Sequence, residues 1–211
     1  MECQKTDSLR LLINTGAQLD HRDNEGRTPL SLAAELGNLG HVRILVESNA
    51  DINSADSNGW TPLFWAASRQ HLETLKYLLS NQGVDSDHQD VNGRTPLAIA
   101  AETGYVESIR CLIDTKAKGK RISGIERDLL LWATFQQDVL TVQLLLEADK
   151  SLVNHRVKGR TPLSLATELG NFGIAKLLID AGADVHAIDE IRWPTLKKWL
   201  FESYLPPDSS T

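Results

Sequence analysis

The stretch Gly93-Arg94-Thr95-Pro96-Leu97 decides the fold, because its Thr-Pro-Leu core returns at fixed intervals along the chain. The steps between successive threonines (28 to 61, 61 to 95 and 95 to 161) are 33, 34 and 66, and 66 is twice 33. A period of this length predicts an array of repeated structural units. The other copies are Thr28-Pro29-Leu30, Thr61-Pro62-Leu63 and Thr161-Pro162-Leu163.

Each copy has the chemistry of a tight turn followed by the start of a helix. The threonine hydroxyl can accept a hydrogen bond at a helix N-terminus, and proline fits the first helical turn, where its missing N–H removes no intrahelical bond. Gly93, like the glycine two residues before each of the other threonines, permits a turn with positive φ. The leucine then begins the buried face, and the small pair Ala100-Ala101 lets a neighbouring helix approach closely.

The period divides the chain into repeats that each contain a short helix and a longer one. The N-terminal segment matches only the second half of a repeat, and in the fourth repeat Asp128-Leu129-Leu130 replaces Thr-Pro-Leu, although Asp128 can still cap a helix. We expect one domain over residues 1–205 and a disordered tail at 206–211. The domain comprises a half repeat (6–20), complete repeats at 23–55, 56–89, 90–122, 123–156 and 157–188, and a C-terminal cap helix (189–205).

These residues resemble the ankyrin repeat family, whose repeats have a period of 33, a β-turn, two helices and a T-P-L-H-x-A motif. Ala50-Asp51-Ile52-Asn53 and Gly182-Ala183-Asp184-Val185 resemble the closing G-A-D-V-N of the family, and the T-P-L-S variant resembles repeats of long fungal arrays. The resemblance implies an all-α solenoid of stacked helix-turn-helix repeats with β-turn or hairpin loops. The family's histidine is absent, and its positions hold Ser31, Phe64, Ala98, Leu131 and Ser164.

Composition limits the compartment and the class of ligand. The net charge of −6 and the pI near 5.5 argue against general nucleic-acid binding, which usually requires a basic surplus. The two cysteines, Cys3 and Cys111, are too few for a disulfide framework and indicate a reducing compartment. The first residues are polar, and no apolar run approaches the length that a membrane-spanning helix needs. We therefore expect an intracellular monomer, cytoplasmic or nuclear, without a membrane segment.

The residues that could carry chemistry are scattered. His21 and His88 share a position in the period, but they lie two repeats apart, roughly 20 Å at about 10 Å per helical layer. That separation exceeds the reach of one metal ion. Asp85 and Asp87 lack the pattern of a calcium loop, and the glycines fall at periodic turns instead of forming a phosphate loop. We expect a chain that is not an enzyme and holds no metal or cofactor.

The repeats predict a binding surface along their turns and short helices, where the family resemblance places partner contacts. The position before the threonine reads Arg, Trp, Arg, Arg, Arg, and tryptophan and arginine are the usual anchors of protein interfaces. The arginines could bind an acidic peptide, or they could pair with Glu35, Glu102 and Glu168. Trp65 and Trp132 are expected in the core. The predicted partner-binding residues are Arg27, Glu35, Asn58, Trp60, Arg69, Asn92, Arg94, Arg127, Phe135, Lys158 and Arg160.

The expected function is that of a non-catalytic scaffold that binds another protein or peptide through this concave surface. One alternative is that the chain forms the repeat segment of a larger signalling or enzyme polypeptide. Another is an anionic-ligand binder, which would combine the arginine series with the basic run Lys116–Arg121.

Overall fold

The computed structural model describes the backbone of residues 2–117, 127–156 and 159–186, and the side chains of 6–114, 129–156 and 159–186. The chain divides into two compact units, Met1–Ile125 and Glu126–Thr211, which we call the N-terminal and C-terminal units and describe separately. Within the described residues the secondary structure consists of α-helices and one 3-10 helix, without a strand. The all-α fold expected from the sequence is therefore confirmed.

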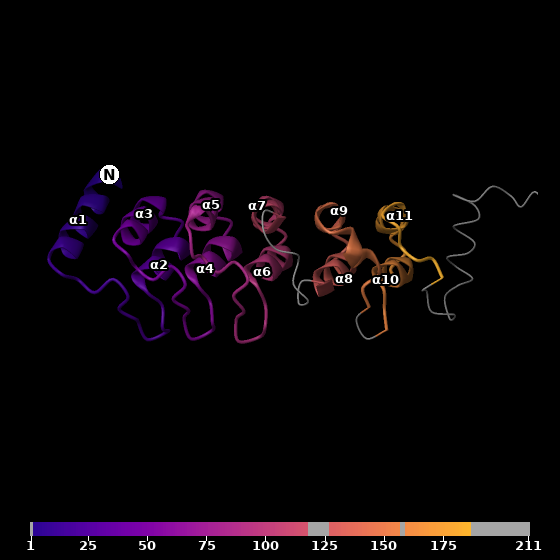
Figure 1. The fold of residues 1–211 in the computed structure, drawn as a ribbon, viewed down its shortest axis with the longest axis horizontal. Coiled ribbons are helices and arrows are strands. Elements are labelled where there is room, and N and C mark those ends of the chain that lie inside the picture. Colours follow the sequence, from indigo (N-terminus) through magenta and orange to yellow (C-terminus); the bar gives the residue numbers. More distant parts are fainter. Residues whose placement is uncertain (1, 118–126, 157–158, 187–211) are drawn as a thin grey trace, which may run out of the picture. The chain divides into compact units, whose positions relative to one another are not determined.

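In the N-terminal unit the helices form two rows, and the connecting loops project to one side (Figure 1). The short helices α2, α4 and α6 pack against one another in order, and the second helix of each repeat packs behind the first. The row of second helices begins with α1, which packs on α3. The bounds are α1 (Glu2–Asn14), α2 (Pro29–Glu35), α3 (Leu39–Glu47), α4 (Pro62–Ser68), α5 (Leu72–Ser80), α6 (Pro96–Thr103) and α7 (Val106–Ala117).

The C-terminal unit repeats the arrangement with two pairs of helices. The first helices of the pairs, α8 and α10, pack on each other, and the second helices, α9 and α11, do the same. The bounds are α8 (Arg127–Phe135), α9 (Val139–Ala148), the 3-10 helix η1 (Lys150–Asn154), α10 (Pro162–Glu168) and α11 (Phe172–Asp180). The predicted cap helix at 189–205 and the predicted tail at 206–211 lie outside the described residues.

The Thr-Pro-Leu motif starts helices as its chemistry predicts. The hydroxyls of Thr28, Thr95 and Thr161 each accept a hydrogen bond from the amide three residues later, and proline occupies the first helical turn. At Thr161 the cap is reciprocal, because the Ser164 hydroxyl accepts the Thr161 amide at 3.1 Å. Thr61 differs: its buried hydroxyl has no hydrogen-bond partner among the described residues.

The core lies between the two rows of helices. The leucines of the motif are buried (Leu30, Leu63, Leu97 and Leu163), and so are residues of the second helices such as Val42, Leu75 and Ile109. The expectation that Trp65 and Trp132 belong to the core is wrong, because both are only half-buried. Phe64, one residue before Trp65, is fully buried instead. Trp65 donates its indole N–H to the Asp56 carboxylate at 3.2 Å, so its polar edge has a hydrogen-bond acceptor.

Gly37, which follows the end of α2, fits closely against the next repeat. Its φ of +66° lies in the left-handed region, and a Cβ placed on it would overlap the imidazole ring of His71. That ring is itself fixed, because its Nε2 donates to the carbonyl of Glu35 at 2.9 Å. Gly37 and His71 thus join consecutive repeats at the ends of their short helices.

We expect Gly37→Ala to lower the free energy of unfolding by about 2 kcal/mol, because alanine both strains the backbone and displaces His71. In a His71→Ala background the same change is expected to cost only about 1 kcal/mol, the backbone part alone. Urea titration of the four proteins of this double-mutant cycle measures the difference. Equal costs in the two backgrounds would show that the close fit to His71 contributes nothing.

Candidate protein-binding surface

Three aspartates hold the loop turns of the N-terminal unit. In each turn one carboxylate oxygen accepts the amides of the residues two and four positions later, at 2.8–2.9 Å. These residues are Asp23, Asp56 and Asp90, each five positions before a motif threonine. Successive turns are also joined, since Ser57 donates its amide to Glu25 and Val91 donates to Asn58, both at 3.0 Å. The period of the aspartates could have identified them from the sequence.

The arginine that precedes the threonine is held by the turn and by the helix that follows. Arg27 lies 2.9 Å from Asp23 and 3.2 Å from both Glu25 and Glu35. Arg94 repeats the pattern with Asp90 at 2.7 Å and Glu102 at 3.1 Å. In the C-terminal unit, Arg160 lies 3.2 Å from Glu168. The predicted pairing with Glu35, Glu102 and Glu168 is confirmed, so much of this guanidinium charge is balanced within the chain.

Asp90 is the most enclosed carboxylate of the series, with a side chain that is 0 % exposed. Its burial raises the pKa, but hydrogen bonds from the Arg94 side chain and from the amides of Arg94 and Asn92 outweigh that effect, so its pKa lies below the usual value. The pKa of Asp23 is also lowered, first by the hydrogen bond from the Arg27 amide. Both carboxylates are therefore charged at neutral pH.

The second repeat carries Trp60 where its neighbours carry arginine. The Trp60 indole donates to Asp90 of the next turn at 3.3 Å, and its ring is half-buried. The ring stacks on Phe64 with centroids 5.8 Å apart and meets Trp65 edge-on at 4.7 Å. Trp60 therefore joins two turns and covers the buried Phe64, while part of its ring stays accessible.

Glu35 connects this aromatic group to the first repeat. Its carboxylate pairs with Arg27 and, through its other oxygen, with Arg69 at 2.9 Å. The Arg69 guanidinium lies 5.8 Å from the centre of the Trp65 ring, close enough for a cation–π contact. Charged and aromatic side chains thus form one continuous network over three repeats.

The structure brings most of the predicted site residues together in the N-terminal unit. Arg27, Glu35, Trp60, Arg69 and Arg94 belong to the network just described. Asn58 and Asn92 are exposed at the loop tips. Phe135, which is 59 % exposed, and Arg160 belong to the C-terminal unit, whereas the side chains of Arg127 and Lys158 and the basic run Lys116–Arg121 lie outside the described side chains.

One surface residue was missed in the sequence. Val91 is 70 % exposed at the tip of the third loop, next in the chain to Asp90. An apolar residue at this position in the period, which holds Asn24 and Ser57 in the preceding repeats, was the available signal. Val91 adds apolar surface to the loop tip, next to the Asp90 that binds the Trp60 indole.

The described part of the chain contains neither a metal-binding cluster nor a helix that could span a membrane. No three His, Cys, Asp or Glu side chains there could hold a metal ion together. Likewise, none of its helices has the length and apolar character needed to cross a membrane.

Comparisons with known proteins agree with the geometry. Two solved ankyrin repeat domains, each 27 % identical, are similar in structure. The domain from Acinetobacter baumannii AYE has a TM-score of 0.72 over 87 % of this chain and 95 % of its own. The domain of Bcl-3, a member of the IkappaB protein family, has a TM-score of 0.75 over 85 % of this chain and 80 % of its own.

Sequence comparison gives a partial match to one curated protein and a match to a family model. The serine/threonine-protein kinase VIK of Arabidopsis thaliana is 40 % identical over 81 residues, which are 38 % of this chain and only 18 % of the kinase. A family model described as ankyrin repeats (3 copies) matches residues 1–56, 50–124 and 123–189. With stacked helix pairs, capped Thr-Pro-Leu starts and matches over nearly its whole length, the chain belongs to the ankyrin repeat family.

Proposed function

We propose that this chain is a non-catalytic interaction module that binds a partner protein or peptide through the turns and short helices of its N-terminal unit. Ankyrin repeats are a protein-interaction module, and their stacking creates an extended binding surface. The observation that carries the proposal for this chain is the exposed Val91, which follows the Asp90 that binds the half-buried Trp60, on turns that hydrogen bonds hold in place.

We define the loop-tip surface as Asn58, Trp60, Arg69, Val91 and Asn92. It combines the exposed Val91 and the half-buried Trp60 with two exposed amides and one guanidinium that is 54 % exposed. Arg27 and Arg94 form ion pairs with carboxylates of the same chain. Recognition of a partner by charge alone therefore has little support, and binding of anionic ligands has equally little. The partner that fits is a segment with an apolar side chain for the Val91–Trp60 patch and an acidic group near Arg69.

The double variant Asn58→Lys/Val91→Glu is expected to weaken binding to captured partner proteins by about tenfold or more, because it places a carboxylate in the apolar patch. Both side chains are exposed, so the fold is retained. Quantitative affinity capture followed by mass spectrometry compares the variant with the unaltered chain. Trp60→Ala is less suitable, since Trp60 also covers Phe64 and binds Asp90.

The matched control exchanges two charges in the other row of helices. Glu73 and Lys76 form an exposed ion pair on α5, so Glu73→Lys/Lys76→Glu keeps both the pair and the net charge. This control is expected to capture the same partners as the unaltered chain. If the loop-tip variant captures them equally well, or only the α5 variant loses them, the partner does not bind the loop-tip surface.

A second candidate is that the chain serves as the partner-binding segment of a larger polypeptide, and the match to part of a protein kinase favours it. An immunoblot of the native source with an antibody to residues 23–55 tests this idea. A band well above the 23.4 kDa of this chain would support it, whereas a band at that mass would refute it.

A further inference from the structure

The dipeptide Asn-Gly occurs twice in this chain, as Asn58-Gly59 and as Asn92-Gly93. Both copies occupy the same position in their loop turns, and both asparagines are exposed. Asparagine is chemically labile, and it loses its side-chain ammonia most readily in front of glycine, which has no side chain to shield its amide nitrogen. The chain therefore contains two like sites for this reaction, which only the surrounding fold distinguishes.

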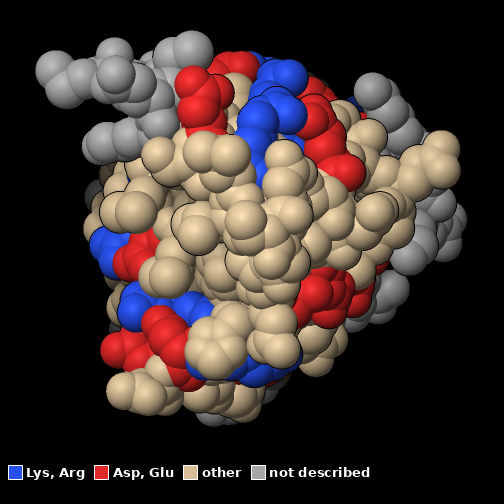
Figure 2. All heavy atoms as spheres, turned by 90° about the vertical axis from the view of Figure 1, so that its left-hand side faces the viewer, with Lys and Arg blue, Asp and Glu red and all other residues tan. Residues whose placement is uncertain are grey.

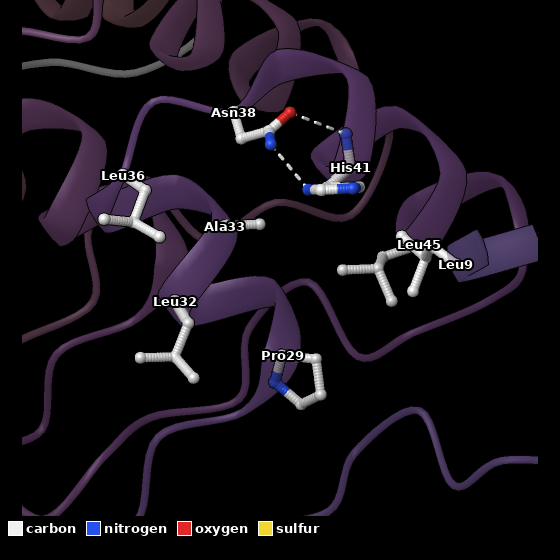
Figure 3. A pocket seen from close by; sticks show the side chains of 8 residues that line it. All are labelled: Leu9, Pro29, Leu32, Ala33, Leu36, Asn38, His41 and Leu45. Atoms are coloured by element: carbon white, nitrogen blue, oxygen red, sulfur yellow. Dashed lines mark hydrogen bonds between the residues drawn. The ribbon is translucent and has the colours of Figure 1, made fainter. Parts of the chain in front are cut away.

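Several other asparagines of the chain have side chains that hydrogen bonds hold in place. Figure 3 shows Asn38, whose side-chain oxygen accepts the amide of His41 at 3.2 Å while its nitrogen bonds the ring of the same residue at 2.6 Å. Three more are held by comparable bonds: Asn53, Asn154 and Asn171. The side chains of Asn58 and Asn92 form no such bond with the described residues, so both are free to rotate.

The fold holds the peptide group between Asn58 and Gly59 at both ends. The Asn58 carbonyl accepts the amide of Val91 in the next turn at 3.0 Å, and the Gly59 amide donates to the carbonyl of Asp56 at 2.9 Å. Gly59 also lies against the next repeat, since a Cβ placed on it would come within 2.9 Å of the Cα of Asp90. Any rotation of this peptide group must therefore break a contact between two repeats.

The peptide group between Asn92 and Gly93 has fewer contacts. The Gly93 amide donates to the Asp90 carbonyl at 2.9 Å, but within the described part of the chain the Asn92 carbonyl accepts no bond. No described atom lies within 4 Å of a Cβ placed on Gly93. The fourth repeat has Ser123 and Glu126 where the first three have the turn aspartate and glycine. Less structure therefore has to open here than in the preceding turn.

We propose that Asn92 is a site of spontaneous deamidation in the folded chain. The backbone nitrogen of Gly93 attacks Cγ of Asn92, and a C–N bond forms. The bond between Cγ and Nδ2 breaks, and the amide proton of Gly93 leaves with that nitrogen as ammonia. Water then opens the succinimide ring at either carbonyl, which leaves aspartate or isoaspartate. The reaction needs no partner, so the proposal does not rest on the proposed function.

The product changes the charge of the loop-tip surface. On the face of the molecule that Figure 2 draws, acidic and basic side chains lie side by side. Near the modified position, Arg94 is already paired with Asp90 and Glu102, so the new carboxylate beside Val91 adds a negative charge to a balanced group. Isoaspartate also lengthens the backbone of the turn, which displaces the amides of Asn92 and Arg94 that Asp90 accepts.

Peptide mapping by mass spectrometry measures both sites in one sample of the full chain, incubated at mildly alkaline pH. In the folded chain we expect Asn92 to lose ammonia about tenfold or more faster than Asn58, because fewer contacts must open. In guanidinium chloride the two sites should react at similar rates, since the fold no longer distinguishes them. Equal rates in the folded chain would overturn the proposal, and so would an Asn92 that stays intact while the unfolded chain reacts.

Two matched variants assign the charge change to one residue. Asn58→Gln and Asn92→Gln each keep an amide at an exposed position, but glutamine must close a larger ring and reacts far more slowly. Ion-exchange chromatography should show a more acidic form that accumulates in the unaltered chain and in Asn58→Gln, and that is lost in Asn92→Gln. Accumulation of this form at an unchanged rate in Asn92→Gln would overturn the proposal.

Discussion

Replacing Phe64 with alanine is expected to lower the free energy of unfolding of the N-terminal unit by about 3–5 kcal/mol. Phe64 is completely buried, and its ring contacts Trp60 and His88. The third repeat holds an alanine at the same position, Ala98, which is also buried. In the second repeat the same alanine would leave a cavity beneath Trp60.

Chemical denaturation monitored by circular dichroism measures this cost. Leu36→Ala is the control, because it truncates an apolar side chain that is 76 % exposed and is expected to change stability by less than about 0.5 kcal/mol. Phe64→Leu should fall between the two, since leucine fills part of the space. A loss below about 1 kcal/mol for Phe64→Ala would show that this ring is not part of the core.

Asp90→Ala is expected to cost a similar amount, about 3–5 kcal/mol, because it removes the acceptor on which two repeats converge. The Asp90 carboxylate accepts the amides of Asn92 and Arg94, both at 2.9 Å, and the Arg94 side chain at 2.7–2.8 Å. It also accepts the Trp60 indole at 3.3 Å. Alanine would leave these donors without the carboxylate, which is itself closed to solvent.

The variant Asp90→Asn distinguishes the contribution of the Asp90 charge from that of its hydrogen bonds within the turn. Its amide oxygen can still accept the two backbone amides, so we expect a smaller loss than for alanine. Urea titrations of both variants at neutral pH measure the difference. Equal losses would mean that the charge of Asp90, and hence its pairing with Arg94, carries the whole effect.

The charge of Asp90 also predicts a dependence on pH. Because the folded pKa is depressed, the carboxylate contributes its stability in full above its unfolded pKa of about 3.9 and loses it as the pH falls through the folded pKa. The free energy of unfolding should therefore fall below about pH 4, and less steeply in Asp90→Asn. Parallel slopes for the two proteins between about pH 5 and pH 2 would contradict this role.

The fold could be predicted from the sequence because its rules are local. Threonine, proline and glycine fix a cap, a helix start and a turn within a few residues, so each copy of the motif specifies the same structure. Repetition at a constant period then determines the stacking. The ion pairs of Arg27 and Arg94 were open to prediction for the same reason, since all their carboxylate partners lie within eight residues of the arginine.

The features that depend on contact between repeats could not be predicted in this way. The bond of Trp60 to Asp90 spans 30 residues, and that of Arg69 to Glu35 spans 34. The period places Trp65 at the position where other repeats have a buried leucine or isoleucine. It does not reveal that the indole N–H of Trp65 requires a hydrogen-bond acceptor. The close fit of Gly37 to His71 likewise arises only when two repeats are stacked.

Hydrogen–deuterium exchange of the purified chain with a captured partner tests the central claim, that partners bind the loop-tip surface. We predict slower exchange on binding in the loop segments 57–60 and 91–94, with no change in α5, which lies in the other row of helices. Protection confined to α5 or to the other second helices, with the loop segments unaffected, would contradict the claim.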